Sequence, residues 1–307
     1  MSSSARRRQL LLVWLGAFVV LAVAVAASVV LSNRSSSHAS PPVSSSSPGL
    51  HSQASPTASS PLPSVPSAAS SPSVSIPPRP PDDRPGPVIL VPGYGGDAGM
   101  LDPLALQLRK AGRTTIVLDL PNAATGDLRG QEKVLAAQVS AELKKGAPSV
   151  DLVGYSAGGI VVALYVEADP SHVRRVVTLG SPLHGTRVAG LAAGLVPSAC
   201  PTACEQMVPG SPLLASLASA SPDMTGVPWL SMWTSHDEVV LPPDSARFIG
   251  ARNVELQTIC ADDAAGHTTL PADPLAIGLT VQTLGTSPLP LPTPAASECA
   301  ALRALAG

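Results

Sequence analysis

Short apolar runs separated by helical segments constrain the fold of this chain more than any other feature of its sequence. Six such runs follow Pro87, with glycine-rich loops or segments of helical apolar spacing between them. The runs are Val88–Val91, Thr115–Leu118, Val150–Val153, Val176–Leu179, Trp229–Trp233 and Val254–Ile259. Strands this apolar are buried on both faces, and the intervening helices supply the cover. The pattern predicts an α/β fold with a mostly parallel sheet of about six strands and helices on both faces.

The start of the chain predicts a membrane anchor. Arg6–Arg8 precede a charge-free, mainly apolar run, Leu10–Leu31. A transmembrane helix needs about 20 such residues, so the run is long enough. Because flanking arginines stay in the cytoplasm, we expect residues 1–9 inside and the following chain outside the cell membrane, in a single-pass arrangement. The alternative is a cleaved signal with its cleavage site in Ala22–Ala27, which would give a secreted protein.

Residues 32–86 are expected to be a disordered linker. They are rich in Ser, Pro and Ala and cannot bury enough apolar surface to offset the entropy of ordering. The composition favours an extended tether that carries one folded domain, residues 87–307; a proline-rich ligand for a partner domain is the alternative. With 19 Lys and Arg against 21 Asp and Glu, and no basic stripe, the chain lacks the electrostatic features of a nucleic-acid binder.

Ser156 is the predicted nucleophile. It lies in the G-x-S-x-G sequence Gly154–Gly158, between a predicted strand and an apolar helix. A tight turn at such a junction projects the serine hydroxyl out of the sheet. A structural serine in a packed turn is the alternative interpretation.

A serine hydroxyl needs a base that takes its proton, and the base needs a carboxylate that orients it. After a G-x-S-x-G turn of this kind, both residues follow the serine in the chain, and the acid comes before the base. His267 follows the last predicted strand and is the predicted base. We expect His172 to be a surface residue and His184 to shape its own loop, whereas His236 comes too early to follow its own acid.

Asp237 is the predicted acid, because it stands just after the strand Trp229–Trp233. Its neighbour Glu238 is expected to point elsewhere. Asp262 and Asp263 are rivals, but they share the loop of the histidine and are expected to cap or solvate it.

Two backbone donors should stabilise the negative charge of a tetrahedral intermediate. One is expected to be the N–H of Ala157, directly after the nucleophile, and the other the N–H of Tyr94, in the loop after the first strand. The glycines around Tyr94 can also be explained by a turn alone. This chemistry requires no metal and no cofactor.

At these positions the chain resembles the small bacterial triacylglycerol lipases and esterases of the α/β-hydrolase superfamily. The segments that carry the resemblance are Val91–Gly96, Gly154–Gly159, Val177–Pro182, Ser235–Val240 and Gly250–Val254. The resemblance covers residues 87–285 and implies a carboxylic ester hydrolase with Ser156, Asp237 and His267 as its catalytic residues. Two features depart from it. The oxyanion loop has Pro92-Gly93 where the family often has His-Gly, and residues 185–227 form a long insertion that the smallest members lack.

The insertion contains apolar residues such as Leu191 and Leu195, and we expect either a mobile lid over the serine or a fixed buttress.

Outside the cytoplasm the four cysteines should oxidise. Neighbours in sequence suggest Cys200–Cys204 and Cys260–Cys299, although four cysteines permit three pairings. The second bond would hold the tail 287–307 beside the His267 loop.

These features together predict a membrane-tethered, extracytoplasmic serine ester hydrolase that acts through an acyl-enzyme, works as a monomer and takes an ester or lipid substrate. An envelope acyltransferase with the same three residues, or a non-catalytic protein that binds a lipid or a partner, are the alternatives.

Overall fold

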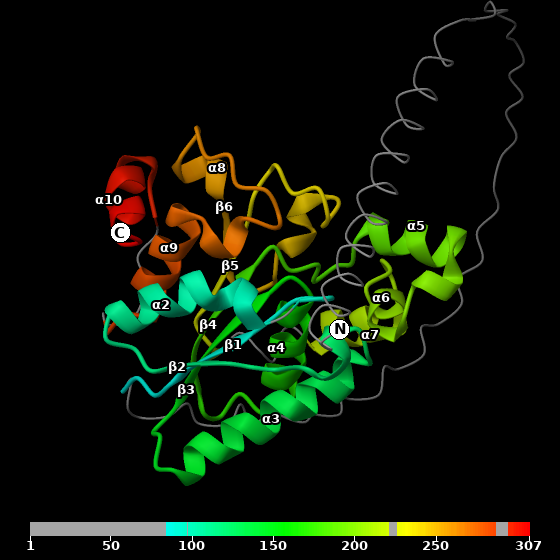
Figure 1. Cartoon of the computed structure of the whole chain (residues 1–307), viewed down its shortest axis with the longest axis horizontal. Helices are drawn as coiled ribbons and strands as arrows, with labels where there is room; N and C mark the ends of the chain where they lie inside the picture. Colours follow the sequence, from blue (N-terminus) through cyan, green and yellow to red (C-terminus); the bar gives the residue numbers. More distant parts are fainter. Residues whose placement is uncertain (1–83, 97, 221–225, 287–293) are drawn as a thin grey trace, which may run out of the picture. The chain divides into compact units, whose positions relative to one another are not determined.

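The computed structural model describes residues 84–96, 98–220, 226–286 and 294–307, which form an α/β domain (Figure 1). The predicted anchor and nearly all of the linker, residues 1–83, lie outside the described residues. Within the described part, no helix is both long and apolar enough to cross a membrane.

A six-stranded parallel sheet forms the centre of the domain, as predicted. The strands are β1 (Val88–Val91), β2 (Thr115–Val117), β3 (Val150–Tyr155), β4 (Val173–Leu179), β5 (Trp229–Trp233) and β6 (Arg252–Glu255). Their order is β2-β1-β3-β4-β5-β6, and all neighbours pair in parallel. The order of the strands changes direction at β1 and β3. In open parallel sheets, ligands bind at the carboxyl ends of the strands beside such a point.

Helices cover both faces of the sheet (Figure 1). They are α2 (Asp102–Lys110), α3 (Leu128–Lys144), α4 (Ala157–Ala168), α9 (Pro274–Leu284) and α10 (Cys299–Ala304). Alternate side chains of β1 point to opposite faces: Ile89 and Val91 pack in one buried cluster with α3 and α4, and Val88 and Leu90 pack in the other with α2, α9 and α10. The two-sided burial explains why the strands are apolar throughout.

Four predicted strands have different bounds in the structure. Strand β2 ends one residue earlier than predicted, at Val117, and β3 ends two residues later, at Tyr155. The run Val254–Ile259 was predicted as one strand, but β6 ends at Glu255 and a short helix, α8 (Leu256–Ile259), follows. Leu256 and Ile259 are both buried, which fits the helical spacing of three residues. Strand β4 begins at Val173, three residues before the predicted start, and includes two buried arginines.

A buried charge cluster accommodates one of these arginines. Asp151, fully buried in β3, accepts hydrogen bonds from Arg113 at 2.6 Å and from Arg174 at 2.9 and 2.5 Å. Both arginines also donate to the backbone oxygen of Leu284, at the carboxyl end of α9. The cluster therefore joins the sheet to the last turn of a helix that would otherwise leave carbonyl groups without donors.

The insertion divides into a packed half and an exposed half. Its packed half contains α6 (Thr202–Gln206) and α7 (Pro212–Ala220), with Ala203 and Leu217 fully buried. Gln206 binds the amino end of α3, accepting from Leu128 N at 2.8 Å and donating to Asp127 at 2.6 Å. These contacts favour the fixed buttress for this half.

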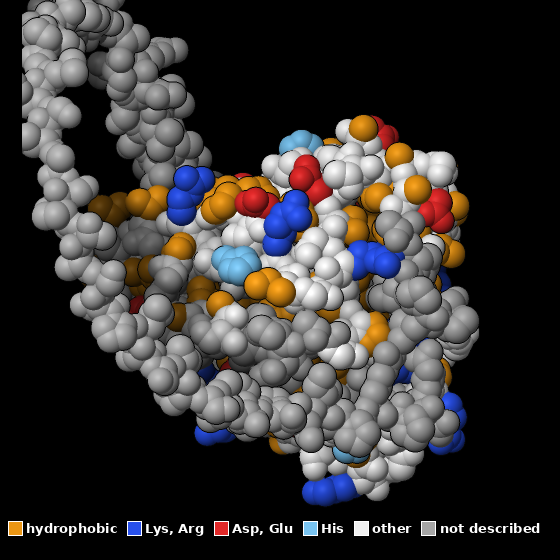
Figure 2. Space-filling view, turned by 180° about the vertical axis from the view of Figure 1, so that it is seen from behind, with side chains coloured by type: hydrophobic (Ala, Val, Ile, Leu, Met, Phe, Trp, Pro, Cys, Tyr) orange, Lys and Arg blue, Asp and Glu red, His pale blue; other side chains and the backbone are white. Residues whose placement is uncertain are grey.

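The exposed half is α5 (Arg187–Leu195), where only Ala189 is buried and Leu191 and Leu195 are exposed. On the face in Figure 2, the Lys and Arg side chains that can be seen are scattered rather than joined in a stripe.

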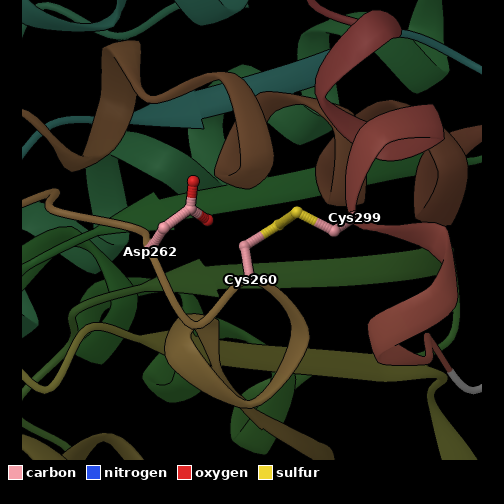
Figure 3. A group of neighbouring side chains, drawn as sticks. All are labelled: Cys260, Asp262 and Cys299. Carbon is pink, nitrogen blue, oxygen red and sulfur yellow. A yellow bond between two sulfur atoms is a disulfide. The ribbon is translucent and has the colours of Figure 1, made fainter.

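Two disulfides fix the ends of surface segments. One joins Cys200 to Cys204 at the start of α6, and the other joins Cys260 to Cys299, the first residue of α10 (Figure 3). Arg303 of α10 adds ion pairs with Asp262 at 3.1 Å and with Asp263 at 3.2 Å. The carboxyl-terminal helix is thus attached to the loop that leads to His267.

Candidate active site

Ser156 lies on a sharp turn between β3 and α4. Its φ of 53° and ψ of −128° are unusual for a residue with a side chain. The turn also brings the first turn of α4 against β1: a Cβ atom added to Gly158 would lie 2.3 Å from the carbonyl oxygen of Val91, so only glycine fits. The motif thus has the strained strand–turn–helix geometry that exposes a nucleophilic hydroxyl.

The structure brings Ser156, His267 and Asp237 together. Nε2 of His267 lies 3.0 Å from Oγ of Ser156, and Nδ1 lies 2.8 Å from Oδ2 of Asp237. The exposed fractions are 8% for Ser156, 4% for His267 and 3% for Asp237, so all three are shielded from bulk water. Low exposure strengthens the attraction between the carboxylate and an imidazolium.

The carboxylate of Asp237 is fixed by its own loop. Its Oδ1 accepts hydrogen bonds from the backbone N–H groups of Val239 at 2.9 Å and Val240 at 2.7 Å, leaving Oδ2 for the imidazole. Gly180, with a φ of 52°, lies next to Asp237 and His267. A Cβ atom added to it would lie 3.2 Å from Oδ2 of Asp237 and 3.3 Å from Nδ1 of His267. Gly180 was not predicted as part of the site, although a glycine directly after a predicted strand was an available signal.

The rival residues lie outside this arrangement. His172, His184 and His236 are all exposed. Asp262 is exposed and pairs with Arg303. Asp263 is buried, and its Oδ1 accepts a hydrogen bond from the backbone N–H of Ala265 at 3.1 Å, which is the capping role expected for it.

Glu238 makes a contact that was not predicted, because its side chain reaches the backbone of the His267 loop. Its Oε2 accepts a hydrogen bond from the backbone N–H of His267 at 3.0 Å. Tyr155, also missed, donates from its hydroxyl to the backbone oxygen of His267 at 2.9 Å. Burial raises the pKa of the Tyr155 phenol, and the charges of Asp237 and Glu238 raise it further, so the group remains a donor. No sequence pattern reveals these two contacts, since both partners come from distant segments.

Of the two predicted backbone donors, Ala157 follows the serine directly, and Tyr94 adjoins a glycine that lies close to the serine. Ala157 is the first residue of α4, where an N–H has no acceptor within the helix. Gly93, next to Tyr94, approaches closely: a Cβ atom added there would lie 2.7 Å from Cβ of Ser156. Tyr94 itself is half-buried, and burial raises the pKa of its phenol. The loop after β1 and the amino end of α4 can therefore face a carbonyl oxygen on Ser156.

One group of side chains has the spacing of a metal site but not its chemistry. Cys260, Asp262 and Cys299 lie together in Figure 3. Because the two sulfur atoms are joined in a disulfide, they cannot act as thiolate ligands.

Comparisons with known proteins agree with the observed fold. A family model described as "alpha/beta hydrolase fold" matches residues 86–202. Aspergillus fumigatus lipase B has a similar structure, with a TM-score of 0.57 and 23% sequence identity over 72% of this chain and 61% of the fungal chain. This chain therefore spans less than two thirds of that lipase.

Bacillus licheniformis lipase BlEst2 in its mature form gives a TM-score of 0.53 and 20% identity over 65% of this chain and 91% of the other. A search of curated proteins finds no match. The family match over residues 86–202, the order of the sheet and the turn at Ser156 together show that this chain has the α/β-hydrolase fold.

Proposed function

We propose that the protein is a serine hydrolase that cleaves carboxylic esters through an acyl-enzyme. The observation that carries the proposal is the continuous hydrogen-bonded chain Ser156–His267–Asp237, which is buried and ends at a strained serine. Nucleophile, base and orienting acid are thus within reach of one another in the order this chemistry needs.

In the first half of the reaction, Oγ of Ser156 attacks the ester carbonyl while Nε2 of His267 takes the hydroxyl proton. Asp237 holds Nδ1–H and stabilises the imidazolium. The N–H groups of Ala157 and Tyr94 face the oxyanion of the tetrahedral intermediate. His267 then returns the proton to the leaving alcohol, and the acyl group remains on Ser156. In the second half, water replaces the alcohol and releases the carboxylic acid.

An ester of a lipid is the proposed substrate class. Two structures of similar fold are described as lipases, and the exposed leucines of α5 offer apolar surface on the insertion. We further propose that the domain acts outside the cytoplasm, anchored by Leu10–Leu31. The two disulfides support this location, because such bonds persist in oxidising compartments.

The full chain, purified in detergent, should hydrolyse nitrophenyl esters of increasing chain length. Ser156→Ala should abolish turnover and labelling by a fluorophosphonate, whereas Ser140→Ala on α3 should retain both. A folded wild-type protein that does not react with the fluorophosphonate would refute the proposal and favour a binding role. Labelling without net hydrolysis, together with ester exchange to an added alcohol, would replace hydrolysis by acyl transfer.

A further inference from the structure

The peptide groups on either side of His267 are held by two side chains. Glu238 accepts from the backbone N–H of His267 at 3.0 Å, and Tyr155 donates to its backbone oxygen at 2.9 Å. Tyr155 immediately precedes the nucleophile Ser156, and Glu238 immediately follows the acid Asp237. The base is therefore tied, through its own backbone, to the two segments that carry its partners.

The Glu238 contact depends on the residue before the histidine. A Cβ atom added to Gly266 would lie 2.8 Å from Oε2 of Glu238, so a side chain at position 266 would occupy the space that the carboxylate uses. The side chain of Glu238 is exposed as a whole, and yet its terminal oxygen is directed at one backbone N–H.

The Tyr155 contact comes from the opposite side and from the core. Tyr155 is buried at the end of β3, and the centre of its ring lies 5.2 Å from that of the imidazole. Its hydroxyl bridges to residue 267, which is 112 positions away in sequence. Since His267 lies in a loop between α8 and α9, rather than in a strand, this bridge connects it directly to the sheet.

We propose that Tyr155 and Glu238 are positioning residues that hold the backbone of His267, and thereby set the distance from its Nε2 to Oγ of Ser156. The role rests on the proposed function, because it concerns the proton transfer between these two atoms. The side chain of Asp237 orients the imidazole ring, whereas Tyr155 and Glu238 fix the point from which the ring projects.

Kinetics of single variants test the role. Tyr155→Phe and Glu238→Ala should each lower kcat for a nitrophenyl ester by about tenfold and leave KM within about twofold, because small displacements of a base slow the chemical step rather than binding. Glu238→Gln should restore most of the activity, since the amide oxygen can accept the same N–H bond. The matched controls are Tyr165→Phe on α4 and Glu132→Ala on α3, which should behave like the wild type.

Hydrogen exchange supplies a readout that does not depend on turnover. The chain has six histidines, so labelling histidine with ¹⁵N isolates the backbone amide of His267 from nearly all others. Glu238→Ala should speed exchange of this amide, and Glu238→Gln should return it towards the wild-type rate.

The outcomes separate the two proposals. An active wild type whose kcat is unchanged in Tyr155→Phe and Glu238→Ala would overturn the positioning role alone. Equal losses in Glu238→Gln and Glu238→Ala would also overturn it, because charge rather than backbone contact would then matter. A wild type inert to esters and to the fluorophosphonate would overturn the proposed function and this role with it, even if the exchange data confirmed the contact.

Discussion

Replacing Asp151 by Asn removes the only negative charge in the Asp151–Arg113–Arg174 cluster. The carboxylate is fully buried and accepts three hydrogen bonds from the two guanidinium groups. Asn has nearly the same size, but it leaves two buried cations facing a neutral amide. Breaking a buried pair in this way typically costs about 3–5 kcal/mol. Because both arginines keep their bonds to Leu284, we expect the lower end of this range, about 3 kcal/mol.

Urea unfolding followed by circular dichroism measures this loss. For a domain of this size the free energy of unfolding falls by about 3 kcal/mol per molar urea, so the midpoint of Asp151→Asn should lie about 1 M below that of the wild type. Asp262→Asn is the matched control, since it removes an exposed carboxylate paired with Arg303 and should leave the midpoint unchanged. Equal midpoints for Asp151→Asn and the wild type would refute the reasoning that the buried charge holds the cluster together.

Asp237→Asn should lower kcat by about 10³–10⁴, because an amide cannot stabilise the imidazolium; a loss below about tenfold in ester turnover would place the acid elsewhere. Gly180→Ala should lower kcat by about tenfold or more, since its methyl group would press on Asp237. Gly112→Ala is the control for backbone strain, because Gly112 has a φ of 80° and a Cβ atom added there would have no other atom within 4 Å. Equal effects of Gly180→Ala and Gly112→Ala on kcat would contradict a role for the contact between position 180 and Asp237. Replacing Cys260 and Cys299 together by Ser should lower the free energy of unfolding by about 2–4 kcal/mol in non-reducing urea titrations; an unchanged midpoint would show that the bond adds no stability.

The parts of the fold that follow from local pattern could be predicted from the sequence. Strands β1 and β5 have the predicted bounds, Val88–Val91 and Trp229–Trp233, and all of their residues are buried. Ser156, His267 and Asp237 could be chosen because each follows a strand, and the carboxyl ends of parallel strands meet at one edge of the sheet. Their order along the chain then identified Ser156 as the predicted nucleophile, Asp237 as the acid and His267 as the base.

The remainder depends on contacts between distant segments. Arg174 and Arg175 were left out of the predicted strand, since nothing local reveals that Asp151 and the end of α9 offer them partners. The contact of Glu238 could not be predicted either, because its partner is a backbone group in another loop. Hydrophobic pattern carries no information on such polar contacts.

The hydrogen bonds of the active site have a consequence for the order in which the molecule assembles. Ser156 and His267 are 111 residues apart, and Arg113 meets Leu284 across 171 residues. Contacts so far apart along a chain form late, after loop closure has been overcome, whereas helices form within microseconds. During refolding, recovery of ester cleavage should therefore lag behind recovery of helical signal, and enzymatic activity would report the last step of assembly.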